Sequence, residues 1–208
     1  IWHKFIARAL EAGAAGVITQ EPVDGPHVLV PDSFEALRAL GRASRARSRA
    51  KIIGVTGSVG KTGTKEALFQ AFDHIEPGKA HRSLKSYNNH VGVPLSLARM
   101  PRDAAFGVFE MGMNHAGELA DLTRLVRPDV AIVTAIAPAH IEYFGTEEAI
   151  ARAKAEIFEG LSGAGTAIIP CDSAHVSLLY NAASRYAARI VTFGIGKGAD
   201  VHPVESVV

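Results

Sequence analysis

Apolar residues along this chain recur in two alternating patterns, short uninterrupted runs and longer stretches spaced by three or four positions. The short β-branched runs are typical of buried parallel strands, and the wider spacing is typical of amphipathic helices. The patterns predict strands at residues 51–56, 105–110, 129–134, 165–169 and 190–193, and helices at residues 61–74, 91–99, 115–126, 146–160 and 173–187. This alternation predicts an α/β fold whose mainly parallel sheet carries helices on both faces.

The first 50 residues show a smaller pattern of their own. They predict a helix over residues 3–13, strands at 16–19 and 27–30, and a second helix that begins after Asp32 and Ser33. This second helix runs into a basic segment, residues 42–51, which lacks interleaved aromatic residues. We interpret the basic segment as a solvated helix end and not as a nucleic-acid patch. A domain boundary is expected near residue 50.

Composition narrows the classes of protein to consider. The 208 residues are 48% apolar and 21% charged with a formal net charge of +1, so no overall field favours nucleic acid or a membrane. A single cysteine, Cys171, cannot form an internal disulfide and suits a reducing cytoplasm. No apolar run approaches the ~20 residues of a membrane span. The chain begins at Ile1 and ends on a strand-like segment, so we expect a piece of a longer protein.

A glycine-rich segment, residues 56–63, lies between an apolar run and a helical pattern. Strand, glycine turn and helix in this order let backbone N–H groups and a helix N-terminus approach phosphate oxygens. Lys61 is placed to reach terminal phosphates, and the Thr62 hydroxyl to bind Mg²⁺. The common Gly-x-x-x-x-Gly-Lys spacing would require glycine at position 55, which is Val55. The segment nevertheless predicts a nucleoside triphosphate site.

Polar residues follow the other predicted strands. Glu110 ends an apolar strand and is placed to hold Mg²⁺ beside the phosphates. His140 lies in an apolar turn after the strand at 129–134, a pattern that fits a structural histidine as well as a ligand. Asn88 and Asn89 precede a predicted helix. Their side-chain amides could either cap that helix or bind substrate.

Lys154 lies beside the apolar face formed by Ile150, Ala153 and Ile157. The pattern by itself favours a side chain that extends its ammonium group to solvent. Burial would instead lower its pKa, and a neutral amine reacts with CO₂ to give a carbamate, which is an anionic metal ligand.

Five motifs occur in a fixed order. They are Thr-Gly-Ser-x-Gly-Lys-Thr from Thr56, Asn-Asn-x-x-Gly-Val-Pro from Asn88, Glu-Met-Gly-Met-Asn from Glu110, Ala-His-Ile-Glu-x-Phe-Gly from Ala139, and Ala-Lys-Ala-Glu-Ile-Phe from Ala153. Across residues 51–160 this order resembles the Mur ligase family, most closely its D-alanyl-D-alanine-adding members. The resemblance implies that residues 1–50 end an N-terminal UDP-substrate domain and that residues 51–208 form a P-loop-type ATP-binding domain. The family's C-terminal domain would be absent.

The resemblance also assigns roles to residues. The ATP cradle would comprise Thr56, Gly57, Ser58, Val59, Gly60, Lys61, Thr62 and Gly63. Metal ligands would be Thr62 and Glu110, with His140 and carbamylated Lys154 supporting a second Mg²⁺. Lys61, Lys154 and His140 would be catalytic, and Asn88 and Asn89 would face the substrate. Val59 and Gly63 depart from the family pattern, in which a polar residue and a further threonine are expected.

The implied activity is that of an ATP-dependent carbon–nitrogen ligase. It would convert the carboxylate of UDP-N-acetylmuramoyl-tripeptide into an acyl phosphate and join it to D-alanyl-D-alanine in peptidoglycan precursor synthesis. We expect a cytoplasmic monomer without nucleic-acid partners or membrane insertion. The chain alone is expected to bind ATP without completing ligation.

Three alternatives stay open at this stage. Another Mur ligase or a folylpolyglutamate synthase would share the glycine loop and the lysine. A P-loop ATPase is a second class, although it predicts an aspartate where the strand ends in Glu110. A nucleotide- or UDP-sugar-binding module without catalysis is the third.

Overall fold

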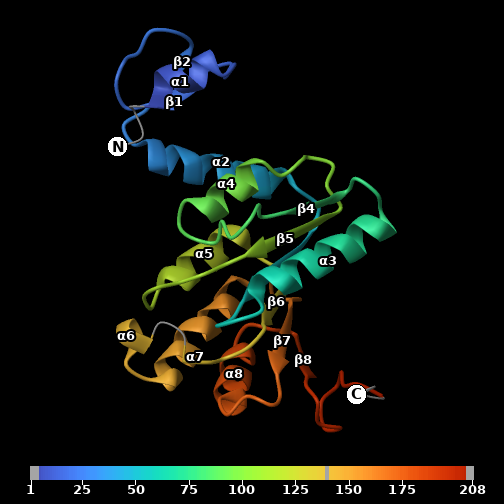
Figure 1. Ribbon diagram of the computed structural model, residues 1–208. Coiled ribbons are helices and arrows are strands. Elements are labelled where there is room, and N and C mark those ends of the chain that lie inside the picture. Colours follow the sequence, from blue (N-terminus) through green and yellow to red (C-terminus); the bar gives the residue numbers. More distant parts are fainter. Residues whose placement is uncertain (1–4, 139–140, 205–208) are drawn as a thin grey trace.

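The computed structural model describes residues 5–138 and 141–204 (Figure 1). Within these residues, six strands pair into one sheet in the order β4-β5-β3-β6-β7-β8, and every pairing is parallel. The strands are β3 (Lys51–Thr56), β4 (Ala80–Arg82), β5 (Phe106–Glu110), β6 (Val130–Val133), β7 (Thr166–Pro170) and β8 (Arg189–Phe193). The predicted parallel α/β fold is thereby confirmed.

Helices connect the strands. They are α3 (Lys61–Ile75), α4 (Gly92–Ala98), α5 (Glu118–Val126), α6 (Ile141–Phe144), α7 (Glu147–Ala155) and α8 (Val176–Ala183), with a 3₁₀ segment, η2 (Glu156–Gly160), directly after α7. Parallel neighbours need such crossover connections, because no tight turn can return the chain to the same end of the sheet. None of the helices in the described residues is long and apolar enough to cross a membrane.

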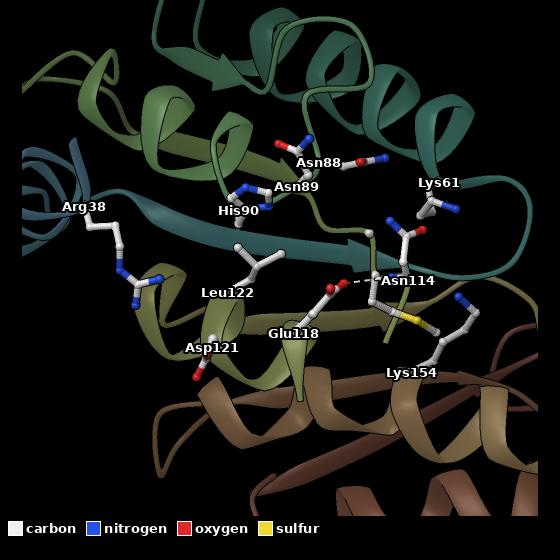
Figure 2. A pocket seen from close by; sticks show the side chains of 12 residues that line it. Arg38, Lys61, Asn88, Asn89, His90, Asn114, Glu118, Asp121, Leu122 and Lys154 are labelled. Carbon is white, nitrogen blue, oxygen red and sulfur yellow. Dashed lines mark hydrogen bonds between the residues drawn. The ribbon is translucent and has the colours of Figure 1, made fainter. Parts of the chain in front are cut away.

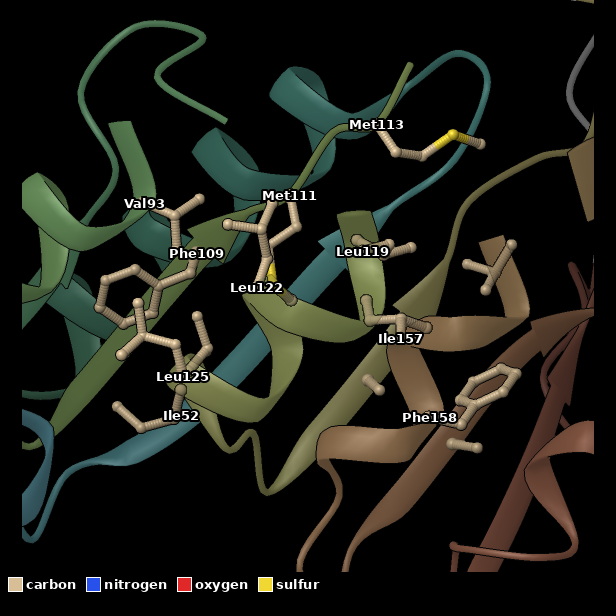
Figure 3. Packing of buried hydrophobic residues seen from close by; sticks show 14 of the residues in the cluster. Ile52, Val93, Phe109, Met111, Met113, Leu119, Leu122, Leu125, Ile157 and Phe158 are labelled. Atoms are coloured by element: carbon tan, nitrogen blue, oxygen red, sulfur yellow. The ribbon is translucent and has the colours of Figure 1, made fainter. Parts of the chain in front are cut away.

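Alternation along the strands sends side chains to two separate apolar clusters. Ile53, Val55 and Val108 pack with Leu68 and Phe72 of α3 on one face. On the opposite face, Ile52, Phe109 and Met111 join the larger cluster, which Leu122, Leu125, Ile157 and Phe158 complete from α5 and η2 (Figure 3). Coverage on both faces follows from this period of two, as predicted.

The N-terminal residues form a small unit followed by a long helix. The strands β1 (Val17–Thr19) and β2 (His27–Leu29) pair in parallel beside α1 (Ile6–Glu11). Helix α2 (Ser33–Arg47) begins where the Asp32 carboxylate accepts hydrogen bonds from the N–H groups of Phe34 and Glu35, as the capping prediction required.

Helix α2 packs against α4 and α5 of the larger unit. The side chain of Arg45 donates 2.8 Å hydrogen bonds to the carbonyl oxygens of Val126 and Arg127, where α5 ends. The interpretation of the basic segment as a solvated helix end is therefore wrong for Arg45, because its guanidinium satisfies the last carbonyls of a neighbouring helix.

Several predicted boundaries differ from the observed ones. The helix predicted at 115–126 begins at Glu118, because the Glu118 carboxylate accepts hydrogen bonds from the N–H groups of Asn114 and His115 and holds them in a turn. The helix predicted at 146–160 changes to 3₁₀ geometry at Glu156. There, the Glu156 carboxylate accepts hydrogen bonds from the N–H groups of Gly117 and Ala120, which ties the segment to α5.

Two short elements were not predicted, and one helix is shorter than its pattern. Strand β4 and helix α6 contain three and four residues, too few to show a period. The helix predicted at 173–187 spans only Val176–Ala183.

Candidate active site

The strand register brings three chain segments to one edge of the sheet. Val55 is paired with Glu110 of β5, and Thr56 is paired with Val133 of β6. The glycine segment after β3, the carboxylate at the end of β5 and the segment after β6 therefore meet at the carboxyl ends of the strands. In open parallel sheets, ligands bind at this edge.

The glycine segment is held against the residues that follow β6. A Cβ atom on Gly57 would lie 1.9 Å from the Thr134 hydroxyl oxygen, so only glycine fits there. Thr134 donates a 2.6 Å hydrogen bond to the Val59 carbonyl, and Ser58 donates one of 2.8 Å to the Ala137 carbonyl. Gly60 precedes α3 with a positive φ of 86°, which favours glycine. The loop is thus shaped before any ligand binds.

The two unusual positions do not disturb this shape. Val59 contributes its backbone carbonyl to the contact with Thr134, while the residue is 59% exposed. Gly63 lies in the first turn of α3, and nothing lies within 4 Å of the place where its Cβ would be. Neither departure from the expected pattern disturbs the backbone contacts of the loop.

Lys61 begins α3 with its ammonium group folded over the loop. Its Nζ donates hydrogen bonds of 2.6 Å to the Gly57 carbonyl and 3.3 Å to the Ser58 carbonyl. Burial lowers the pKa of Lys61, against the opposing effect of the Glu110 carboxylate. The two carbonyls hold the ammonium group at the loop.

Glu110 is buried with 1% exposure and is contacted from three directions. The Thr62 hydroxyl donates a 2.9 Å hydrogen bond to Oε2, and Asn88 Nδ2 donates one of 2.8 Å to Oε1. Lys65 Nζ lies 3.6 Å from Oε2. The structure thus brings together three of the residues named from the sequence, Thr62, Asn88 and Glu110.

Lys154 is buried in α7 with 4% exposure, so the expectation that its ammonium group reaches solvent is wrong. The helix packs its Lys154 face inward because Ile150, Ala151, Ala153 and Ala155 around it are all buried. Burial and, to a smaller extent, the nearby positive charge of Lys61 lower the pKa of Lys154 to about 8. An amine with this pKa is partly neutral near pH 8.

The two asparagines have different environments. Asn89 Oδ1 accepts hydrogen bonds from the N–H groups of Val91 and Gly92 where α4 begins, so it holds the start of that helix. Asn88 instead faces Glu110. His140 lies outside the described residues.

Lys61, Asn88, Asn89 and Lys154 line one cavity of about 420 Å³ (Figure 2). Arg38, Asn114 and Glu118 line it as well, and the sequence analysis did not select them. Arg38 belongs to α2 and reaches the cavity only through the packing of α2 on α4, which no local pattern reveals. Asn114 is the last residue of the Glu-Met-Gly-Met-Asn motif that begins at Glu110, so its position in the sequence could have marked it as a site residue.

The donor atoms present suit magnesium. Mg²⁺ prefers oxygen ligands and keeps several waters, so one carboxylate and one hydroxyl beside a nucleotide are enough for it. Thr62 and Glu110 supply these two groups 2.9 Å apart. Among residues 5–138 and 141–204, no group of three or more His, Cys, Asp and Glu side chains gathers in a way that could hold a metal ion.

Comparison with known proteins places this geometry in a family. Residues 55–206 match the Mur ligase middle domain. The UDP-N-acetylmuramoyl-tripeptide–D-alanyl-D-alanine ligase of Rickettsia prowazekii is 41% identical over 80% of this chain and 38% of its own length.

Two solved structures are similar to this chain over nearly all of its length. MurF from Acinetobacter baumannii superposes with a TM-score of 0.84 and 32% identity over 98% of this chain and 44% of its own. MurF from Thermotoga maritima in complex with ADP superposes with a TM-score of 0.79 and 31% identity over 95% of this chain and 45% of its own. The chain spans less than half the length of these relatives. The family match and the parallel sheet agree, and the chain belongs to the Mur ligase family, with residues 55–206 forming its middle domain.

Proposed function

We propose that this chain is the ATP-binding part of a ligase that adds D-alanyl-D-alanine to UDP-N-acetylmuramoyl-tripeptide. The observation that carries the proposal is the convergence of Lys61, Thr62, Glu110 and Lys154 at one edge of the sheet. A phosphate loop explains Lys61 and Thr62. A buried lysine with a pKa of about 8 beside that loop is not needed to hydrolyse ATP, but it suits a carbamate-bearing ligase.

ATP would bind with its phosphates on the loop from Thr56 to Gly63. Backbone N–H groups and the N-terminus of α3 would face the phosphate oxygens. Lys61 would exchange the carbonyls of Gly57 and Ser58 for the terminal phosphates, a small movement because its Nζ is already at the loop. The ADP named with the Thermotoga maritima relative is consistent with a nucleotide at this position.

We propose two Mg²⁺ ions, held by Thr62 and Glu110 and by His140 with carbamylated Lys154. Bound magnesium would neutralise the charge that otherwise keeps the γ-phosphate and an anionic carboxylate apart. The carbamate would form when the neutral amine of Lys154 attacks the carbon of CO₂ and loses one proton. Its lowered pKa makes the neutral amine available near neutral pH.

The chemistry would then run in two steps. A carboxylate oxygen of the tripeptide attacks the γ-phosphorus, the bond to ADP breaks, and an acyl phosphate results. The amine of D-alanyl-D-alanine attacks the carbonyl carbon, loses a proton and displaces phosphate. Lys61 and the loop amides would stabilise the negative charge on the transferring group, and Asn88 and Asn89, which line the same cavity, would position the acceptor.

The same proposal covers organisation and location. Residues 1–50 would belong to the UDP-substrate domain and residues 51–208 to the central domain, with Arg38 of α2 completing the shared cavity. We propose that the protein acts as a cytoplasmic monomer, in keeping with its single cysteine.

Ligation in the full-length protein tests the proposal. Continued ADP release over many turnovers should require ATP, the UDP-linked tripeptide and D-alanyl-D-alanine together, and mass spectrometry should detect the pentapeptide product. Other amine substrates, such as a single diamino acid or glutamate, should give no product. ATP hydrolysis that is indifferent to both substrates would instead favour a P-loop ATPase.

A further inference from the structure

Lys65 is a fully buried lysine that the proposed chemistry does not use. It lies in α3 one turn after Lys61, and its exposure is 0%. Its Nζ donates a hydrogen bond to the Lys85 carbonyl and lies 3.2 Å from Oε1 of Glu66 and 3.6 Å from Oε2 of Glu110. Burying an ammonium group is costly unless partners compensate it. These three partners hold the Lys65 ammonium group in one position.

Lys65 belongs to a row of alternating charges. Arg82 Nε lies 2.8 Å from Oε2 of Glu66, and its guanidinium stacks 3.7 Å from the centre of the Phe69 ring. The row therefore runs from Arg82 through Glu66 and Lys65 to Glu110. The outer pair is partly exposed, with the side chains of Arg82 and Glu66 at 28% and 40%, whereas the inner pair, Lys65 and Glu110, is buried at 0% and 1%. The solvent-facing half anchors the buried half.

At the buried end, Lys65 fixes the carboxylate of Glu110. Oε2 faces both the Thr62 hydroxyl and Lys65 Nζ, whereas Oε1 accepts from Asn88. Contacts on both oxygens set the rotation of the carboxylate. Each oxygen can accept two bonds, so Oε1 keeps capacity for a further ligand.

Lys65 also holds the segment that carries Asn88. Lys85 has a φ of 49°, a left-handed conformation that non-glycine residues adopt only when their surroundings impose it. The hydrogen bond from Lys65 to the Lys85 carbonyl supplies such a constraint. Three residues later, Asn88 reaches Glu110. A single ammonium group thus contacts the carboxylate and the loop that carries another of its partners.

We propose that Lys65 is a positioning residue that orients Glu110 and the Asn88 loop for a magnesium-bound nucleotide. It acts through Glu110 and does not touch the nucleotide. The inference rests on the proposed function in one respect, that Glu110 is the magnesium ligand. Groups that orient a metal ligand typically change metal affinity when they are removed.

Nucleotide binding by this chain, measured by calorimetry with and without Mg²⁺, tests the inference. Lys65→Met removes the charge at nearly constant length. It should weaken binding of magnesium–ADP by about tenfold or more. Binding of ADP in EDTA, which depends on the glycine loop and Lys61, should change by less than about twofold. Lys79→Met removes a lysine whose ion pair with Asp103 lies on the surface, and it should change neither value.

A second variant protects the test against misfolding. Lys65→Gln retains a donor for the Lys85 carbonyl without the charge, and thermal unfolding establishes that it is folded. Lys65→Gln should also lose the increase in nucleotide affinity that magnesium gives to the wild-type protein. Equal losses with and without magnesium, or an unchanged gain in either variant, would overturn the positioning role. If wild-type protein itself shows no magnesium-dependent gain, the proposed role of Glu110 fails, and the inference falls with it.

Discussion

The Thr62 hydroxyl donates a 2.9 Å hydrogen bond to Oε2 of Glu110, although 48 positions separate the two residues. Thr62 stands in the first turn of α3 and Glu110 ends β5, so the contact exists only because β3 and β5 are paired in register. It joins the phosphate loop to a buried carboxylate. A cation between a nucleotide and this pair would take the hydroxyl and carboxylate oxygens as ligands.

Glu110→Gln should therefore abolish most of the magnesium-dependent gain in nucleotide affinity. The amide keeps the shape of the side chain but removes its charge, so the loss should be at least about tenfold, or about 1.4 kcal/mol. Calorimetry with magnesium–ADP measures it. Glu118→Gln is the matched control, since Glu118 lines the cavity beside Lys61 and Lys154 and its carboxylate bonds only to Asn114 and His115 among the described residues. Equal behaviour of the two variants would contradict the assignment of Glu110.

Lys61→Ala should weaken nucleotide binding whether or not magnesium is present. Its Nζ bonds only to loop carbonyls in the described structure, so the fold should persist while about tenfold or more of the affinity is lost. Fluorescence titration with a labelled ADP measures the change. Lys51→Ala, at the exposed first position of β3, should bind as wild type does. An unchanged affinity in Lys61→Ala would refute the phosphate cradle.

Gly57 and Gly63 of the glycine loop should respond in opposite ways to replacement by alanine. In Gly57→Ala the new Cβ would collide with the Thr134 hydroxyl, so the loop must shift and nucleotide binding should be lost. In Gly63→Ala the Cβ enters open space inside a helix and should raise stability by about 0.5–1 kcal/mol with binding retained. Urea unfolding and nucleotide titration of both variants check the pair. Normal binding by Gly57→Ala would show that this loop geometry is not required.

Lys154 should make stability depend on pH above neutrality. Its folded pKa is lowered to about 8 from 10.5, so between these values the unfolded chain binds more protons and wild-type stability rises with pH. Below pH 8 the Lys154 amine is protonated in both the folded and the unfolded state, and burying this charge lowers the stability of the folded state. Lys154→Met should therefore be more stable than wild type at pH 7, with the difference shrinking toward pH 10.5.

Thermal unfolding in CO₂-free buffer measures that difference. Arg152→Met is the control, because the Arg152 side chain is 68% exposed and should leave the pH dependence unchanged. The same pH slope in Lys154→Met and wild type would show that folding does not lower the pKa of Lys154.

The glycine loop, the parallel sheet and Glu110 were predictable because each depends on local sequence. Strand β3 is a continuous apolar run whose observed bounds match the prediction, and a carboxylate at a strand end lies at the ligand-binding edge of any parallel sheet. Asn89 was left between two roles: its Oδ1 holds the start of α4, and its substrate role stays a prediction for a residue that also lines the cavity.

Long-range packing set the features that were missed. Lys154 looked free to reach solvent because its own helix shows only one apolar face, and its burial depends on neighbours outside that helix. Arg45 likewise bonds to the distant carbonyls of Val126 and Arg127, and Arg38 reaches the cavity from α2. Lys65 contacts Lys85 and Glu110, which also lie in other segments. Side-chain identity gave no sign of these contacts.

The most direct test of a carbamate-bearing ligase site is a crystal structure of this chain with a non-hydrolysable ATP analogue and magnesium, grown in bicarbonate. We expect a carboxylated Lys154 Nζ with its oxygens on a metal ion, and a second ion on Thr62 and Glu110. Nucleotide and magnesium bound beside an unmodified Lys154 would contradict it.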